Sequence, residues 1–512
     1  KQIVDAVMAA AAVMRGDADK SALEFDVEKE NNGRYYNSKM PRPSGLGKVT
    51  GTLDYGEDAS LKMPPGTLHA AIVQPRVTRH ANIKSIDTSA AEKMPGVVRV
   101  ITGETVVREL GGSNMIDQYP TGMGSPLTGT VVPLMIADAM QGGAGTSANM
   151  NANEVIANLA IAHLGGDYGD YSVVHPIDHV NMNQSTNDVV PTAAKITTIR
   201  KCRRLLKALE KLFKELSRKE EEFGDMLRVG KTQLQDAVPM RVGQGFGAYA
   251  AMVRRSKDDL EKIMERLHFV NIGATAIGTG INADRRYHEN IVSVLSEISA
   301  LPLHRSENLF DATQNTDDFS AVSSCVKVCA LKLSKMASDL RLLSSGPGSG
   351  FHELTLPAKQ SGSSIMPGKI NPVIPEALNQ AAFVVIGNDM TISVATEAGQ
   401  LELNAFLPVI LFRLFEELDI FTNAIKTFVG NCLAGITVNK EKCDEGIGRC
   451  FSIATALNPV IGYDKSTEIV KEAARSGRSV FEVACQESGL DENELKTLLD
   501  PHTLTGDGIS KE

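Results

Sequence analysis

The sequence predicts a mainly α-helical protein in which a bundle of long helices follows a small α+β N-terminal segment. Between Ile199 and Phe223, apolar residues recur at positions i, i+3, i+4 and i+7 while Lys, Arg and Glu fill the rest, which is typical of an amphipathic helix. The stretch Glu376–Phe428 is apolar on more than one face. It therefore predicts a central helix buried among others, with Pro408 as a kink or break. Near residue 140 the sequence changes in character. Before it, short apolar runs are separated by turn residues, and after it, long segments have helical periodicity.

The first 140 residues form the α+β segment of this prediction. Ile3–Met14 is an Ala-rich helical stretch. Three short runs with β-branched residues follow, separated by Pro and Gly, and predict strands at His69–Val73, Ile83–Thr88 and Val97–Thr102.

After Gln141 the sequence predicts further helices around residues 240–270, 312–343 and 410–428. Residues 439–512 predict a smaller helical end with short turns at Asn458-Pro459 and Asp500-Pro501. We therefore expect three domains, at residues 1–140, 141–438 and 439–512. Helices this long and this apolar usually pack against partners, so we also expect an oligomer.

Composition and charge exclude several classes of function. The 512 residues are 42% hydrophobic and 22% charged, as in ordinary globular proteins. The 53 Lys and Arg against 62 Asp and Glu give a net charge of −9, so neither nucleic acid nor a membrane is an expected partner. The longest apolar stretches break too early to span a bilayer, and no secretory segment opens the chain. Seven cysteines without a Cys-x-x-Cys pair predict reduced, mostly buried thiols in a cytoplasmic protein.

Gly, Ser, Thr and Asn are concentrated in four short loops between the predicted helices. These loops span residues 141–147, 183–188, 230–236 and 362–372. Hydroxyl and amide side chains beside exposed backbone N–H groups can hold a small dianion, and Lys369 adds a positive charge. The same residue types dominate helix caps and turns. Composition alone therefore leaves both interpretations open for each loop.

The loop Gly362-Ser-Ser-Ile-Met-Pro-Gly-Lys-Ile-Asn-Pro372 resembles the signature loop of the fumarase/aspartase superfamily. Three further blocks, Asn183–Thr192, Gly230–Pro239 and Gly273–Asn282, are similar to its other blocks and occur in the same order. The resemblance extends from Gln141 nearly to the C-terminus. It implies a long-helix bundle assembled into a homotetramer, with each site built from three subunits.

Within the superfamily the sequence resembles aspartate ammonia-lyases more than fumarases. Fumarases typically carry His where this chain has Gln233, and Gly-Ser-Gly-Thr where it has Gly143-Ala-Gly-Thr146. Gln233 cannot form the pair with Glu376 that the fumarase imidazole forms. The resemblance implies reversible conversion of L-aspartate to fumarate and ammonia, by C3 proton abstraction through an aci-carboxylate intermediate, with no organic cofactor and no metal. Hydration of fumarate to malate is the alternative reaction.

Carried over residue by residue, the resemblance implies a site for a small dicarboxylate amino acid. Ser363 would be the base, since backbone N–H groups and Lys369 can stabilise its alkoxide in a loop that closes over the substrate. The β-carboxylate would be held by Thr146, Ser185, Thr186 and Ser364. Lys369 and Asn371 would hold the α-carboxylate, while Asn187 and Gln233 would orient the amino group.

Residues 1–103 resemble a different family, a fragment of a molybdenum-containing aldehyde oxidoreductase or xanthine dehydrogenase. Gly47–Tyr55 and Pro65–Ala70 are among the segments that carry this likeness. No Cys precedes Cys202, so the fragment cannot build an iron–sulfur cluster and we expect it to be non-catalytic. The absence of an initiating Met favours a truncated or chimeric reading frame. A second hypothesis is therefore an inactive helical scaffold that binds carboxylates, because the first lyase segment is missing.

Overall fold

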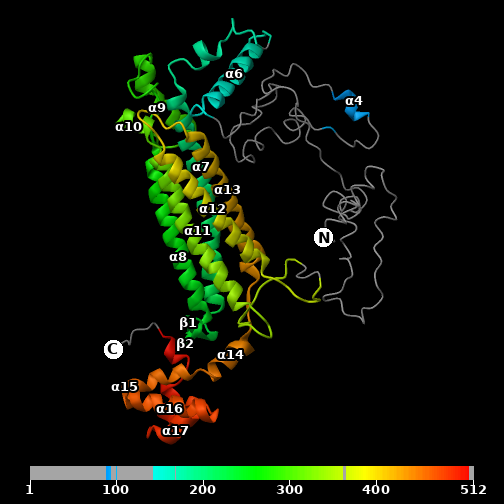
Figure 1. The fold of residues 1–512 in the computed structure, drawn as a ribbon, viewed down its shortest axis with the longest axis vertical. Coiled ribbons are helices and arrows are strands. Elements are labelled where there is room, and N and C mark those ends of the chain that lie inside the picture. Colours follow the sequence, from blue (N-terminus) through cyan, green and yellow to red (C-terminus); the bar gives the residue numbers. More distant parts are fainter. Residues whose placement is uncertain (1–87, 94–99, 101–141, 168, 361–364, 507–512) are drawn as a thin grey trace, which may run out of the picture. The chain divides into compact units, whose positions relative to one another are not determined.

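The computed structural model describes residues 88–93, 100, 142–167, 169–360 and 365–506 (Figure 1). Within the predicted α+β segment, Ser89–Glu92 form the single-turn helix α4, and Thr88 Oγ1 donates to Glu92 Oε1 at 2.7 Å. The predicted strands lie outside the described residues except for Thr88 and Val100, and neither of these is in a strand. The likeness to a molybdenum enzyme likewise falls almost entirely outside the described residues.

Long helices of the described residues form a bundle (Figure 1). They are α7 (Thr186–Glu222), α8 (Val242–Met264), α11 (Asp317–Leu343), α12 (Val373–Glu397) and α13 (Leu407–Asn431). Around the bundle, α7 packs along α8, α8 along α11, α11 along α12, α12 along α13, and α13 along α7. The apolar stripe predicted for α7 faces this core, where Leu205, Leu209 and Leu212 are fully buried. The prediction of a mainly α-helical, long-helix bundle is confirmed.

The stretch predicted as one central helix is two helices, α12 and α13, that run back along each other. The chain reverses at residues 398–406, where Asn404 Nδ2 donates to the carbonyl of Ala395 at 3.0 Å and Phe406 N donates to Asn404 Oδ1 at 2.8 Å. Pro408 lies in the first turn of α13, where its missing N–H costs no hydrogen bond. The break is therefore a complete reversal just before the proline, and not a kink at it.

Short elements cover both ends of the bundle. At the end where α7 begins lie α6 (Thr146–His163), the π-helix η2 (Pro176–Val180), α9 (Arg285–Ser299) and α10 (Leu309–Gln314), together with η3 (Glu265–His268) and the parallel strands β3 (Phe269–Val270) and β4 (His304–Arg305). At the end where α7 stops lie the antiparallel hairpin of β1 (Leu227–Thr232) and β2 (Gln235–Arg241), the antiparallel pair β5 (Leu354–Thr355) and β6 (Thr437–Val438), and η4 (Leu433–Gly435).

The C-terminal helices have a small core of their own, which includes Leu457, Ile469, Val483 and Leu495. The elements are α14 (Lys440–Gly448), η5 (Phe451–Leu457), α15 (Asn458–Ile461), α16 (Tyr463–Ser476), α17 (Val480–Glu487), α18 (Glu492–Leu498) and η6 (Thr503–Thr505). Asn458-Pro459, predicted as a turn, begins the helix α15 instead, because proline fits the first turn of a helix. Thr505 joins this region to the bundle, since it accepts hydrogen bonds from Arg241 Nε at 3.0 Å and Gln244 Nε2 at 2.9 Å.

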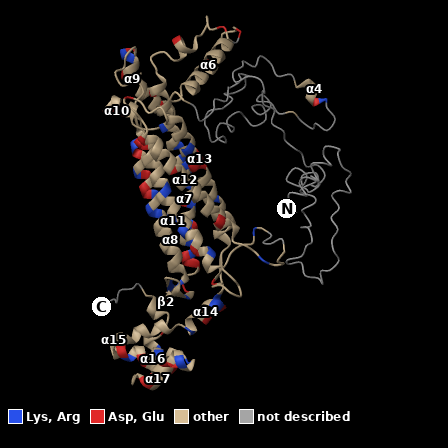
Figure 2. Ribbon diagram, viewed as in Figure 1, with Lys and Arg blue, Asp and Glu red and all other residues tan. Residues whose placement is uncertain are grey.

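Charged residues of both signs are interspersed along the bundle helices (Figure 2). Pairs such as Arg218 with Glu222, 2.8 Å apart, link successive turns of α7. No helix in the described ranges is long and apolar enough to cross a membrane.

Candidate active site

The first turn of α7 carries the predicted substrate-binding residues Ser185, Thr186 and Asn187. Ser185 is the N-cap: its Oγ accepts from the backbone N–H of Asn187 at 3.1 Å, and its own N–H donates to Asp188 Oδ1 at 3.0 Å. This capping box corresponds to the sequence Ser-x-x-Asp. The three residues therefore lie at the N-terminus of a 37-residue helix, where unpaired N–H groups and the helix dipole favour an anion.

Helix α6 brings Thr146 to the same place. Gly145 caps α6 with φ +99°, and a Cβ there would lie 3.2 Å from Cγ1 of Val190 on α7. Glycine is thus required both by the backbone conformation and by the close approach of the two helices. Thr146 is exposed, and its Oγ1 donates to the carbonyl of Gly143 at 2.9 Å.

An amide network holds α6 against α7. The Nδ2 group of the buried Asn149 contacts Asn181 Oδ1 at 3.1 Å and Thr186 Oγ1 at 3.2 Å. Asn153, one turn later on α6, donates to the same Asn181 oxygen at 2.9 Å. Thr146, Ser185, Thr186 and Asn187 are therefore brought together by contacts between side chains that the sequence analysis did not single out.

The block Gly273–Asn282 packs against this turn. Asp188 Oδ2 accepts from the backbone N–H groups of Gly273 at 3.1 Å and Thr275 at 2.9 Å, and Asn187 Nδ2 donates to the carbonyl of Ala276 at 2.7 Å. Asp188 is fully buried. Burial raises the pKa of its carboxyl group to about 6, although backbone hydrogen bonds act in the opposite direction.

The remaining predicted residues lie at the other end of the bundle or outside the described residues. Gln233 is exposed in the turn between β1 and β2, with φ +53°. Lys369 and Asn371 lie just before α12 in the chain, α12 begins at the hairpin end of the bundle (Figure 1), and Lys369 is exposed. Ser363 and Ser364 lie outside the described residues.

One chain therefore holds two separate groups of predicted site residues. Helix α7 has 37 residues, which at 1.5 Å per residue separates its first and last turns by about 55 Å. Thr146 and Ser185–Asn187 lie at the first turn, and Gln233 follows the last turn in the chain (Figure 1). No single copy can bring both groups onto a small substrate.

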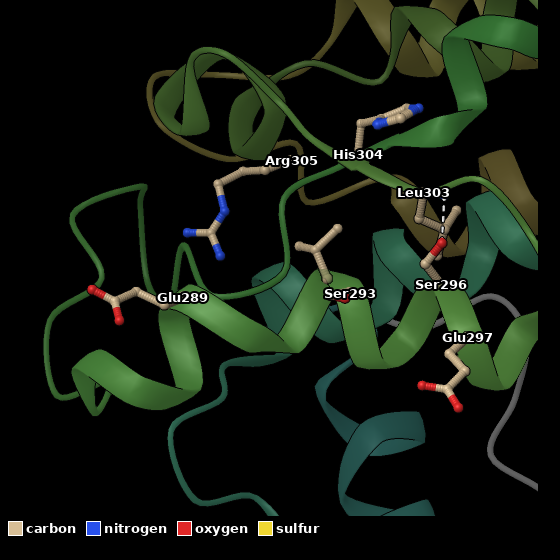
Figure 3. Close-up of a pocket in the computed structure, with 8 residues that line it drawn as sticks. Glu289, Ser293, Ser296, Glu297, Leu303, His304 and Arg305 are labelled. Atoms are coloured by element: carbon tan, nitrogen blue, oxygen red, sulfur yellow. Dashed lines mark hydrogen bonds between the residues drawn. The ribbon is translucent and has the colours of Figure 1, made fainter.

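A pocket of about 570 Å³ opens on α9 and β4, at the α6 end of the bundle (Figure 3). Its lining includes Glu289, Ser293, Glu297, His304 and Arg305. None of the predicted site residues lines it, so this pocket is not the predicted site.

The hydroxyl groups at the α7 end are arranged to donate to an anion. Ser185 Oγ and Thr186 Oγ1 each accept a hydrogen bond from an amide N–H, which leaves their own protons for another acceptor. Asn187 engages its donor end with Ala276, so its Oδ1 is the end that can meet an ammonium group. A carboxylate and an ammonium group could therefore be held side by side.

Sequence reasoning missed the residues that fix this geometry. Asp188 could have been found, because Ser185-Thr-Asn-Asp188 is a capping-box signature. Its contacts with Gly273 and Thr275 span more than eighty residues of chain and follow no sequence period. Likewise, no sequence pattern around Asn149 or Asn181 indicates the contacts that these two side chains make.

Comparison with protein families supplies matches over most of the chain. Residues 131–387 match the family described as "Lyase", and residues 453–506 match the one described as "Fumarase C C-terminus". Both matches begin after residue 130. The aspartate ammonia-lyase of Bacillus subtilis is 48% identical over 375 residues, which cover 73% of this chain and 79% of that enzyme. The aspartate ammonia-lyase of Helicobacter pylori is 46% identical over 72% of this chain and 79% of that enzyme.

Solved structures agree with these matches. The fumarate lyase:delta crystallin from Brucella melitensis bound to cobalt superposes with a TM-score of 0.70 at 48% identity, covering 72% of this chain and 80% of that one. The recombinant class II fumarase from Schistosoma mansoni also has a TM-score of 0.70, at 32% identity over 72% of this chain and 81% of that one.

Proposed function

We infer the reaction from the family to which the chain belongs, the fumarase/aspartase superfamily of lyases, in which its relatives named above are aspartate ammonia-lyases. The chain is a carbon–nitrogen lyase that converts L-aspartate reversibly to fumarate and ammonia. The identity of 46–48% to aspartate ammonia-lyases carries this conclusion, against 32% to the class II fumarase.

The difficult step is removal of a weakly acidic proton from C3 of L-aspartate. The resulting carbanion is delocalised into the β-carboxylate as an aci-carboxylate, so negative charge grows on the oxygens of that group. Donors already in place around these oxygens stabilise the transition state more than the ground state. Loss of ammonia from the adjacent carbon then gives fumarate.

At the α7 end we propose that Ser185 and Thr186 donate to the β-carboxylate. Their hydroxyl protons are available because their oxygens accept amide hydrogen bonds. Thr146 joins them after its hydroxyl leaves the carbonyl of Gly143, and we propose Ser364, which belongs to the same loop as Lys369, as the last donor. Asn187 presents its Oδ1 to the ammonium group of the substrate.

At the hairpin end we propose that Gln233 also contacts the amino group and that Lys369 and Asn371 hold the α-carboxylate. Lys369 is exposed and belongs to the same loop as Ser363. Its positive charge would stabilise the alkoxide of Ser363, which takes the C3 proton as the loop excludes water.

Because one chain holds the two groups about 55 Å apart, we propose that each site is completed by other copies in a homotetramer. The apolar side chains that α12 exposes support this assembly: Phe383 is 61% exposed and Met390 66% exposed on one face. Gly387 lies between them on that face, and a Cβ built there meets nothing within 4 Å. A neighbouring helix could therefore approach closely.

We also propose that the enzyme acts in the cytoplasm. Its seven cysteines are all free, and five of them are buried, as suits a protein that works among reduced thiols.

The test is the ultraviolet absorbance of the conjugated double bond of fumarate, with L-aspartate and L-malate offered separately. We expect a rise with L-aspartate alone. A rise only with L-malate would make the chain a fumarase, and no rise with either, from folded and assembled protein, would favour the inactive scaffold.

A further inference from the structure

One buried carboxylate at the α7 end has no part in the mechanism proposed above. Asp188 accepts hydrogen bonds from three backbone N–H groups in two segments of the chain: Ser185 in the first turn of α7, and Gly273 and Thr275 in the loop that follows β3. Asp188 is fully buried.

We propose that Asp188 is a positioning residue for the lyase reaction. Its ionised carboxylate joins the first turn of α7 to the Gly273–Asn282 loop, and so fixes the hydroxyl groups of Ser185 and Thr186 where the β-carboxylate develops charge. The inference rests on the proposed function, because it takes these two hydroxyl groups as substrate donors.

The chemistry of the contacts requires the ionised form. An ionised carboxylate has strong acceptor sites on both oxygens, whereas protonation makes one oxygen a donor and a weaker acceptor, and an amide makes one end a donor only. Such a donor would face the N–H group of Ser185, or those of Gly273 and Thr275. Because two donors cannot bond to each other, the hydrogen bonds on that side would be weakened or lost. The amide contacts of Asn271 and Asn187 would still join the two segments, at 3.0 Å from Asn271 Nδ2 to the carbonyl of Asn187. We therefore expect that protonation of Asp188, or its replacement by Asn, displaces the first turn of α7 but does not unfold the chain.

The surroundings of Asp188 place its titration close to neutral pH. Among the described residues, Tyr287 and His288 on α9 and Arg305 on β4 are titratable or charged groups near this corner. The hydroxyl of Tyr287 is buried without a hydrogen-bond partner among the described residues. His288 Nδ1 lies 3.1 Å from the carbonyl of Gly273, and its other ring nitrogen contacts the Arg305 guanidinium. With burial raising the pKa of Asp188 to about 6, the carboxylate takes up a proton as pH falls through that value, and the contact opens.

The experiment compares kcat and KM for L-aspartate between about pH 5 and pH 8 in the unmodified enzyme and in Asp188→Asn, Asp188→Glu and His288→Asn. We expect the unmodified enzyme to lose kcat/KM as pH falls through about 6. Asp188→Asn should lower kcat on the order of 100-fold, as loss of a charge-stabilising donor does. Its kcat/KM should then not fall as the pH decreases through about 6. Asp188→Glu should recover part of kcat together with an acid limb that lies at a different pH from that of the unmodified enzyme.

Two results would overturn the proposal: an unchanged kcat in Asp188→Asn, or an acid limb that persists in Asp188→Asn and disappears in His288→Asn. Circular dichroism and sedimentation check that each variant folds and assembles. If Asp188→Asn does not fold, Asp188→Glu decides: a displaced acid limb supports the role, and an unmoved limb contradicts it.

Failure of the proposed function is distinguishable from failure of this inference. If the unmodified enzyme forms no fumarate from L-aspartate, the function fails, and calorimetric binding of succinate tests Asp188 instead. A larger loss of affinity from about pH 7.5 to about pH 5 in the unmodified chain than in Asp188→Asn would support the positioning role, because protonation of succinate itself affects both chains equally. Equal pH dependence in both chains would contradict it.

Discussion

Lys231 and Glu353 form an ion pair that ties the β1–β2 hairpin to the segment leading into the Gly362–Pro372 loop. The two side chains are only 13% and 9% exposed. Arg228 Nη1 lies 3.0 Å from the other carboxylate oxygen of Glu353. Because Gln233 is two residues from Lys231, this pair joins the strand that leads to Gln233 to the segment around Glu353.

Removing the Glu353 charge should therefore affect both stability and substrate binding. Glu353→Gln leaves two cationic side chains at a buried site, and we expect the free energy of unfolding to fall by about 3 kcal/mol. The KM for L-aspartate should rise because Gln233 shifts with the hairpin. Denaturant unfolding and steady-state kinetics measure the two effects, with Glu468→Gln in an exposed pair as the matched control. A stability loss without a change in KM would show that the pair has no role in the site.

The proposed base gives a second prediction. Ser363→Ala should remove nearly all turnover while L-aspartate still binds, because the hydroxyl takes the proton and the other residues supply the binding contacts. Fumarate absorbance measures turnover, and calorimetry measures binding. Ser361→Ala, one residue before that loop, serves as the control and should keep its activity. Full activity in Ser363→Ala would exclude Ser363 as the base.

The separation of the two groups along α7 predicts complementation between inactive variants. Thr186→Val removes a donor at one end and Lys369→Met removes a charge at the other, so each homotetramer should be inactive. Hybrid tetramers formed from a mixture should regain up to about a quarter of full activity, because some sites then draw both intact residues from different chains.

The control for this experiment pairs Thr186→Val with Asn187→Ala. Both residues belong to the same turn of one chain, so this mixture should stay inactive. Recovery in the control, or none in the test mixture, would contradict sites shared between subunits.

The bundle core contains a glutamate that predicts a pH-dependent stability. Glu417 on α13 is fully buried, and the hydroxyl of Ser323 on α11 lies beside its carboxyl group and partly offsets the effect of burial on its pKa. Burial, with smaller contributions from the carboxylates of Asp389 and Glu416, raises its pKa well above the ordinary value. The folded chain then keeps a proton that the unfolded chain releases above its own pKa of about 4.3, so the free energy of unfolding falls as pH rises beyond that value.

Gln has nearly the same shape as Glu but does not titrate, so Glu417→Gln removes this pH dependence of the free energy of unfolding. We expect the melting temperature at about pH 8 to rise by roughly 3 °C, with little change at about pH 4. Glu416→Gln is the matched control and should not raise it, because Glu416 pairs with Arg413 at 2.8 Å. A lower melting temperature for Glu417→Gln at both pH values would show that the carboxyl group makes a stabilising contact.

Much of the bundle could be predicted from sequence because its signal is periodic. Leu205, Leu209 and Leu212 are buried as their spacing predicts. The reversal between α12 and α13 could not be placed, because the amide of Asn404 that caps it acts through hydrogen bonds across the turn. Pro408 indicated a break nearby, but not the residue at which the reversal begins.

The sequence by itself determined the family, the chemistry of the loops and the residues proposed to bind an amino dicarboxylate, since motifs and residue types are local properties. Tertiary structure alone decided where those residues lie. It put Thr146 and Ser185–Asn187 at one end of a 37-residue helix and Gln233 beyond the other. It also buried Asp188 against Gly273 and Thr275. Burial and hydrogen bonds between segments far apart in the chain arise only when the helices pack, so no pattern along the sequence could have revealed them.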